Sequence, residues 1–137
     1  MSVVDNSNTI RIPSEIKYIK QVSTEILNAL SPFGIDENRL FDIKLCVEEA
    51  VCNAIVHGNR IDKKLYVTVH YRINEDKIRI EIEDEGKGFD YNNLPNPTDK
   101  DSIMKGSGRG VYMIYSLMDE VKFNDRGNKI SLMKRLK

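Results

Sequence analysis

Hydrophobic side chains recur along this chain with two periods, and the change from one period to the other predicts its elements. Residues 8–12 alternate polar and apolar side chains, as a half-buried strand does. Pro13 and Ser14 then mark a helix entry, and apolar positions at helical spacing predict a helix over about residues 14–30. These positions are Ile16, Ile19, Val22, Ile26, Leu27 and Leu30. Residues 31–34 (S-P-F-G) end the helix.

A second helix and a hairpin follow. Asp36 is a good N-cap for this helix, and Gly58 followed by Asn59 is a usual C-terminal signal. Two strands are predicted next, over residues 65–73 and 77–84, and the second alternates strictly. The pair predicts an antiparallel hairpin with one buried and one solvated face.

A long segment without periodicity, residues 85–107, separates this hairpin from the last elements. Loops of this length inside a small domain commonly serve as lids or binding loops. Helical spacing resumes after Gly110, and two final strands are predicted at 120–124 and 129–136 around a turn at 125–128. The order of elements predicts an α+β fold, a two-layer sandwich with the helices on one face of a largely antiparallel sheet.

Composition limits the classes of protein to which this chain can belong. A chain of 137 residues is expected to form a single domain over residues 1–137. Lysine plus arginine and aspartate plus glutamate both number 21, which argues against bulk affinity for nucleic acid or acidic lipid. The absence of an apolar N-terminal run predicts neither a signal peptide nor a membrane span, and a cytoplasmic location. Cys46 and Cys52, six apart in one helix, are expected to be small buried hydrophobes rather than a disulfide.

The stretch from Glu48 to Asn59 carries the first candidate chemistry. Glu49 and Asn53 are four residues apart, so they share one face of an otherwise apolar helix. Buried polar groups need partners, and a hydrated divalent metal with a nucleotide phosphate would supply them. A helix end with solvated polar residues is the alternative.

A glycine stretch follows the predicted strand 77–84. Asp84, at the strand end, can accept a hydrogen bond from an exocyclic amine such as that of adenine. Gly86 and Gly88 permit a close approach of a ligand that a β-carbon would block. An ordinary turn after a strand is the alternative.

A second glycine stretch, Gly106 to Gly110, precedes a helix. The free backbone N–H groups and the dipole of a helix N-terminus favour an anion, and Lys105 and Arg109 add cations suited to phosphate. The stretch is neither a Walker loop nor a Rossmann fingerprint. A flexible glycine-rich helix entry is the alternative.

Together the three stretches resemble the motifs of the GHKL ATPase superfamily. Glu49 to Ala54 looks like its N box, Asp84 to Gly88 like its first glycine box, and Gly106 to Gly110 like its second. The run E-A-V-C-N-A-I-V-H-G-N and Met113 to Val121 are similar to the bacterial anti-sigma factor serine-protein kinases in particular. The resemblance covers nearly the whole chain and implies the Bergerat fold, with a mostly antiparallel mixed sheet.

The resemblance also implies a role for each matching residue. Glu49 would be the general base, and Asn53 would give its side-chain oxygen to Mg²⁺ that bridges the phosphates of ATP. Asp84 would hold the adenine amine, and the loop of residues 91–105 would be the ATP lid. The role of His57 is open, and a helix-capping histidine is at least as good an interpretation as a ligand. The expected ATP-binding residues are Asn53, His57, Asp84, Gly86, Gly88, Lys105, Gly106, Ser107, Gly108, Arg109, Gly110 and Val111.

Some positions depart from the family pattern. Arg109 stands where relatives often have an apolar residue, and Gly106 where they commonly have an arginine. Near the last strand a Gly-Thr pair often helps to bind adenine, and here at best Ser131 is offered. These departures weaken the prediction of kinase activity more than the prediction of nucleotide binding.

The resemblance implies a cytoplasmic, ATP-binding anti-sigma regulator that acts as a homodimer. It would phosphorylate a serine or threonine of a small anti-anti-sigma antagonist, and this modification would control binding of a sigma factor. Two alternatives stay open: a non-catalytic module whose partner binding is gated by nucleotide, and a detached histidine-kinase catalytic domain. Direct binding to nucleic acid or to a membrane is not expected.

Overall fold

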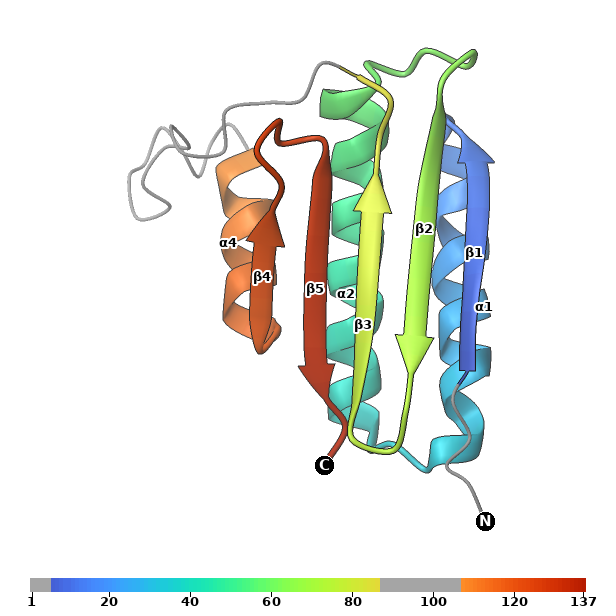
Figure 1. Cartoon of the computed structure of the whole chain (residues 1–137), viewed down its shortest axis with the longest axis vertical. Coiled ribbons are helices and arrows are strands. Elements are labelled where there is room, and N and C mark those ends of the chain that lie inside the picture. Colours follow the sequence, from blue (N-terminus) through green and yellow to red (C-terminus); the bar gives the residue numbers. More distant parts are fainter. Residues whose placement is uncertain (1–5, 87–106) are drawn as a thin grey trace.

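The fold is two layers, a five-stranded sheet with its helices on one face (Figure 1). The computed structural model describes residues 6–86 and 107–137. The strands are ordered β1-β2-β3-β5-β4, and each neighbouring pair is antiparallel. The predicted two-layer α+β class is confirmed, and the described sheet is antiparallel throughout rather than mixed. The elements are β1 (Asn6–Pro13), η1 (Ile16–Tyr18), α1 (Ile19–Leu30), η2 (Ser31–Phe33), α2 (Glu37–Asn53), η3 (Ala54–Gly58), β2 (Tyr66–Ile73), β3 (Lys77–Glu83), α4 (Ser107–Leu117), β4 (Glu120–Phe123) and β5 (Lys129–Arg135).

The strand register explains the alternation in the sequence. The buried side chains form rows across the helix-facing side of the sheet, because residues paired across neighbouring strands point to the same face. One such row is Ile10, Val69, Ile82 and Ile130. The opposite face is polar, and one of its rows is Thr9, His70, Glu81, Ser131 and Lys122. The predicted division into one buried and one solvated face is confirmed.

The first helix begins later than the sequence predicts. Pro13 still pairs with Tyr66 in the sheet, and η1 precedes α1, which begins at Ile19. Ser14 caps no helix, because its hydroxyl donates to the backbone carbonyl of Leu65 at 2.8 Å and its side chain is fully buried. The start of α1 is therefore set by the attachment of Ser14 to the start of β2.

The second helix begins at its predicted cap and its winding ends at Gly58 as predicted, but its last turn is not a regular α-helix. The Asp36 side chain accepts a hydrogen bond from the backbone N–H of Arg39 at 2.8 Å, which confirms the N-cap. After Asn53 the winding widens to a π-type turn, η3, a feature frequent at functional sites. The chain then reverses at Arg60 and Ile61, whose φ angles are 53° and 57°, rather than at Gly58. Left-handed backbone is uncommon for a non-glycine residue and an outlier for a β-branched one.

The last helix includes part of the second glycine stretch. It begins at Ser107, so residues 107–110 form its first turn instead of preceding it. Val111 and Ile114 are buried side chains of this helix, and the buried Met118 directly follows it. None of the helices within the described ranges is long and apolar enough to cross a membrane.

Both cysteines lie on α2 and are free thiols. Cys46 is fully buried, and burial, with a smaller contribution from the nearby Asp42, raises its pKa to about 12. A thiol with such a pKa stays protonated and behaves as a small hydrophobe, as the sequence predicted.

One charged side chain enters the helix layer from β5. The ammonium group of Lys134 donates to the carbonyl of Leu117, at the end of α4, at 2.5 Å. It also lies 3.7 Å from Oδ2 of Asp42 on α2, and its side chain is only 15% exposed. A cation at a helix C-terminus is favourable, so Lys134 fixes α4 beside α2.

We expect Lys134→Met to lower the free energy of unfolding by about 1–2 kcal/mol, because a charged hydrogen bond is lost and Asp42 is left without its cation. Urea denaturation measures this change. Lys122→Met, on the exposed face of β4, is the matched control and should change the free energy by less than about 0.5 kcal/mol. An equal effect of the two substitutions would contradict the role given to Lys134.

Candidate functional site

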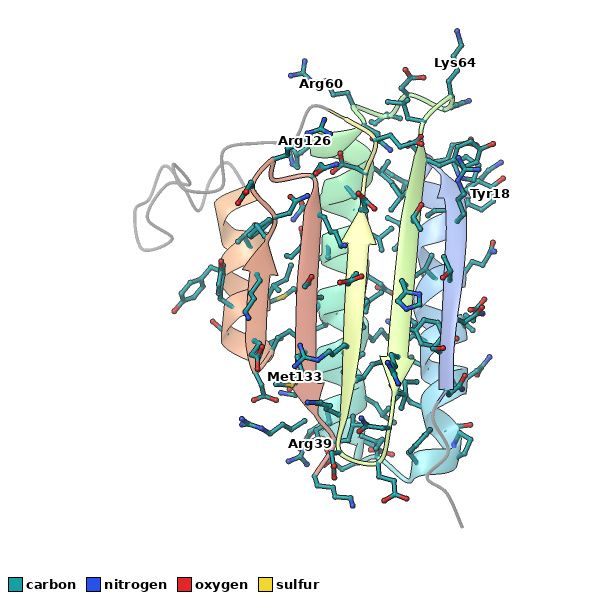
Figure 2. All side chains as sticks on the ribbon, viewed as in Figure 1. Tyr18, Arg39, Arg60, Lys64, Arg126 and Met133 are labelled. Atoms are coloured by element: carbon teal, nitrogen blue, oxygen red, sulfur yellow. The ribbon has the colours of Figure 1, made fainter. Side chains whose placement is uncertain are left out.

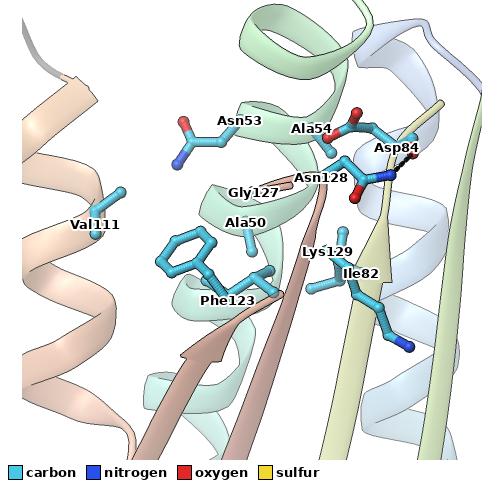
Figure 3. Close-up of a pocket in the computed structure, with 11 residues that line it drawn as sticks. Ala50, Asn53, Ala54, Ile82, Asp84, Val111, Phe123, Gly127, Asn128 and Lys129 are labelled. Carbon is cyan, nitrogen blue, oxygen red and sulfur yellow. Dashed lines mark hydrogen bonds between the residues drawn. The ribbon is translucent and has the colours of Figure 1, made fainter. Parts of the chain in front are cut away.

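A pocket opens where α2, α4 and the ends of β3 and β5 meet (Figure 3). The pocket is small and partly open to solvent. Two of the three predicted stretches contribute to it, through Asn53 and Asp84, and Val111, which directly follows the second glycine stretch, lines it as well. The lining residues are Ala50, Asn53, Ala54, Ile82, Asp84, Val111, Phe123, Gly127, Asn128, Lys129 and Ile130.

Asp84 is the buried charged group of this pocket, with 6% of its surface exposed. Burial raises the pKa of its carboxyl group, and a hydrogen bond from the backbone N–H of Gly86 to Oδ1, at 2.9 Å, acts in the opposite direction. A partly desolvated carboxylate with one donor can accept further hydrogen bonds from a ligand.

Two glycines enclose the Asp84 side chain. A methyl group on Gly58 would place its carbon 2.2 Å from Oδ2 of Asp84. A methyl group on Gly86 would lie 2.0 Å from the carbonyl oxygen of Gly58. Gly86 therefore permits a close approach, and the group that approaches it in this structure is the backbone of Gly58.

The Asn53 side chain points from α2 into the space beside α4, toward Val111 (Figure 3). Within the described part of the chain, no hydrogen bond reaches its carboxamide. The carboxamide is half-buried. It is therefore available to a ligand in this pocket.

Glu49 lies against the first turn of α4. A methyl group on Gly110 would place its carbon 2.4 Å from Oε2 of Glu49. Because Gly110 belongs to that turn, the fold brings Glu49 to the N-terminal end of the helix that carries the second glycine stretch. Glu49 and Asn53, one turn apart on α2, thus face the same end of α4.

The remaining predicted site residues differ in how the structure places them. His57 is exposed and lines a neighbouring cleft with Gly58, Asn59, Arg60, Asp62, Leu65 and Gly86, not the pocket of Asp84. Ser107, Gly108 and Arg109 have a helical backbone in α4, and their side chains lie outside the described residues. Gly88, Lys105, Gly106 and the proposed lid at 91–105 also lie outside them.

The turn between β4 and β5 is the part of the pocket that the sequence did not reveal. Asn128 donates to the carbonyl of Asp84 at 3.1 Å and accepts from the carboxamide of Asn124 at 2.7 Å. Ser131 pairs with Glu81 on the solvated face of the sheet, so Gly127 and Asn128 line the pocket instead. The sequence signal at 125–128 was only that of a turn, and the pairing of β3 with β5 brings it to Asp84.

Basic side chains gather at the end of the molecule where β3 finishes. Arg60 and Lys64 project from the segment between η3 and β2, and Arg126 lies at the same end (Figure 2). Arg126 donates to the carbonyl of Gly86 at 3.3 Å and works against the raised pKa of Asp84. Arg126 therefore ties the β4–β5 turn to the segment after β3.

Comparison with known proteins identifies the family of the chain. The family described as the histidine kinase-like ATPase domain matches residues 12–134. Serine-protein kinase RsbW of Staphylococcus aureus strain JH9 is 32% identical over 136 residues, covering 93% of this chain and 86% of that protein. The RsbW proteins of strains Newman and USA300 match equally well.

A solved structure supports the fold. The crystal structure of the RsbU and RsbW domains of Rv1364c from Mycobacterium tuberculosis matches with a TM-score of 0.66 and 18% identity. The match covers 96% of this chain and 32% of that one, so this chain spans about a third of it. From the family match and the relatives at 32% identity, this chain belongs to the histidine kinase-like ATPase domain family.

Proposed function

We propose that this chain binds ATP and transfers its γ-phosphate to a serine or threonine of a partner protein. The observation that carries the proposal is one site that joins Glu49 and Asn53, the buried Asp84 and the first turn of α4. Membership of an ATPase family supports the nucleotide, and similarity to proteins named serine-protein kinase supports the acceptor.

Asp84 is proposed to bind the adenine base. Its carboxylate is buried and accepts one hydrogen bond from Gly86, so an exocyclic amine is a favourable second donor. Ala54, Ile82 and Ile130 line the same pocket and offer apolar surface to a flat ring. A few polar groups in a mostly apolar cavity is the usual composition of a nucleotide-base site.

The phosphates are proposed to lie at the N-terminal end of α4. Unpaired backbone N–H groups and the helix dipole favour an anion there. No group of three or more histidine, cysteine or acidic side chains that could hold a metal ion occurs among the described side chains. Mg²⁺ would rest on Asn53, phosphate oxygens and water. This ligand set fits Mg²⁺, which keeps several waters and neutralises the charge of the phosphates when bound.

Glu49 is proposed to be the general base, because its carboxylate lies beside the first turn of α4. It would take the proton of the acceptor hydroxyl as that oxygen forms its bond to the γ-phosphorus. The bond from the γ-phosphorus to the bridging oxygen breaks, and ADP leaves. Phosphoryl transfer requires mostly positioning and charge neutralisation, so one base and few ligands suffice.

The partner is proposed to be a small anti-anti-sigma protein, with a sigma factor as the second partner of a homodimer. The similarity of the stretches Glu49 to Asn59 and Met113 to Val121 to anti-sigma factor kinases supports this. We also propose that residues 1–137 form one domain and act in the cytoplasm. A pull-down from native cells with ATP or ADP tests the partners, and recovery of a response regulator instead would contradict them.

We expect Glu49→Gln to reduce the rate of phosphate transfer at least a hundredfold, because loss of a general base typically costs about 10²–10⁴ in rate. The affinity for ATP should change less than about twofold, since the amide keeps the shape of the side chain. Transfer of radiolabelled γ-phosphate to the recovered antagonist measures the rate, and an acid-stable product separates phosphoserine from phosphohistidine.

Glu48→Gln is the matched control for that substitution. Glu48 accepts from the hydroxyl of Ser23 at 2.7 Å and lies 3.6 Å from the ammonium of Lys44, away from the pocket. It should transfer phosphate at close to the normal rate. Full activity of Glu49→Gln, or equal loss in both variants, would contradict the role given to Glu49.

Asn53→Ala is expected to remove the effect of Mg²⁺ on ATP affinity. The normal protein should bind ATP more tightly with Mg²⁺ than with EDTA, and the variant equally in both, because the carboxamide oxygen is the protein's ligand to the ion. Titration calorimetry measures the two affinities. Asn28→Ala, on the exposed face of α1, should behave like the unchanged protein. A retained Mg²⁺ effect in Asn53→Ala would exclude this ligand.

A further inference from the structure

Asn59 is buried between the end of η3 and the start of β2, with 2% of its surface exposed. Its Nδ2 donates to Oγ of Ser14 at 2.8 Å and to the carbonyl of Tyr66 at 3.0 Å. Its Oδ1 accepts from the backbone N–H of Glu85 at 2.8 Å. Both amide hydrogens and the oxygen therefore have partners, which is uncommon for a residue expected only to end a helix.

These contacts join the ends of three strands to the residue that follows η3. Ser14 follows β1, Tyr66 begins β2, and Glu85 comes two residues after the end of β3. Additional bonds close the same cluster: Ser14 Oγ donates to the carbonyl of Leu65 at 2.8 Å, and the N–H of Tyr66 donates to Oε1 of Glu85 at 2.6 Å. The two buried members, Ser14 and Asn59, have their polar groups paired, and such pairing favours one backbone arrangement.

The network reaches Asp84 through one peptide group. The peptide between Asp84 and Glu85 is bound at both ends: its N–H donates to Asn59, and its carbonyl accepts from Asn128 at 3.1 Å. The plane of this peptide determines where the Asp84 side chain points. Gly58, the neighbour of Asn59 in the sequence, forms the wall against Oδ2 of Asp84. Asn59 therefore positions both the backbone and the wall that orient this carboxylate.

We propose that Asn59 is a positioning residue that aims the Asp84 carboxylate at the 6-amino group of the base, and so sets the preference for 6-amino over 6-oxo purine nucleotides. Asn59 does not line the pocket of Asp84 but the neighbouring cleft that also contains Gly58 and Gly86, so we place it outside the contacts proposed for the nucleotide. The inference rests on the proposed function, since it takes Asp84 to be the acceptor for the base. The proposal gives a role to Asn59, to which the helix motif and the two glycine stretches assign none.

The test compares the affinities for ADP and inosine diphosphate, which carries an oxygen in place of the 6-amino group. Calorimetry is done on the full chain at a temperature about 20 °C below the unfolding midpoint of each variant. The unchanged protein should prefer ADP by about tenfold or more, because a hydrogen bond to a charged acceptor is lost with inosine diphosphate. Asn59→Ala should reduce the ratio of the two affinities to below about threefold, mainly by lowering the affinity for ADP.

The ratio of the ADP and inosine diphosphate affinities distinguishes a loss of Asp84 positioning from a general loss of protein stability. Ser23→Ala is the matched control, because it removes a buried hydrogen bond to Glu48 between α1 and α2, remote from Asp84. It should lower the unfolding midpoint and leave the ratio unchanged. If Asn59→Ala does not fold, Ser14→Ala removes one of the three partners of Asn59 and should lower the ratio by about half.

The outcomes distinguish this inference from the function on which it rests. No preference for ADP in the unchanged protein would overturn the assignment of Asp84 to the base, and the role of Asn59 with it. A normal preference that persists in Asn59→Ala, or in Ser14→Ala where the first variant does not fold, would overturn the role of Asn59 alone. Loss of the ratio in Ser23→Ala as well would also overturn it.

Discussion

A buried carboxylate is costly unless donors and close packing surround it, and Asp84 imposes this constraint on the whole structure. Its surroundings come from three separate parts of the chain: the N–H of Gly86, the backbone of Gly58 and the side chain of Asn128 on its carbonyl. The end of α2, the end of β3 and the β4–β5 turn must therefore meet at one point. Side chains larger than hydrogen at Gly58 or Gly86 would prevent that meeting.

The rest of the fold holds α2 in the orientation that places Gly58 against Asp84. Helices α1 and α4 flank α2 on the apolar face of the sheet (Figure 1). Glu48 on one side of α2 contacts Ser23 of α1, and Glu49 on the other side contacts Gly110 of α4. The neighbouring carboxylates of α2 thus have different roles: Glu48 packs against α1, and Glu49 belongs to the proposed site. The catalytic proposal depends on this division, because only Glu49 faces α4.

The sequence predicted the elements whose signals are local. Alternation identified the strands, the Asp36 cap placed the start of α2, and the spacing of Glu49 and Asn53 placed them on one face. The sequence-based prediction was wrong where contacts between residues far apart in the chain determine the structure. Ser14 resembled a helix cap, but its hydroxyl donates to the carbonyl of Leu65, just before β2. Ser131 was offered as the residue near the base, but the register of β5 places it on the solvated face of the sheet. Asn59 was interpreted as a helix end because its partners lie far away in the sequence.

We propose that Asp84, Asn53 and the first turn of α4 form one nucleotide site, and a crystal structure with ADP and Mg²⁺ is the decisive test. We expect the 6-amino group of adenine within hydrogen-bonding distance of the Asp84 carboxylate. We also expect Mg²⁺ bound to Oδ1 of Asn53 and phosphates at the N-terminal end of α4. ADP bound elsewhere, or in this pocket with its base away from Asp84, would contradict this proposal.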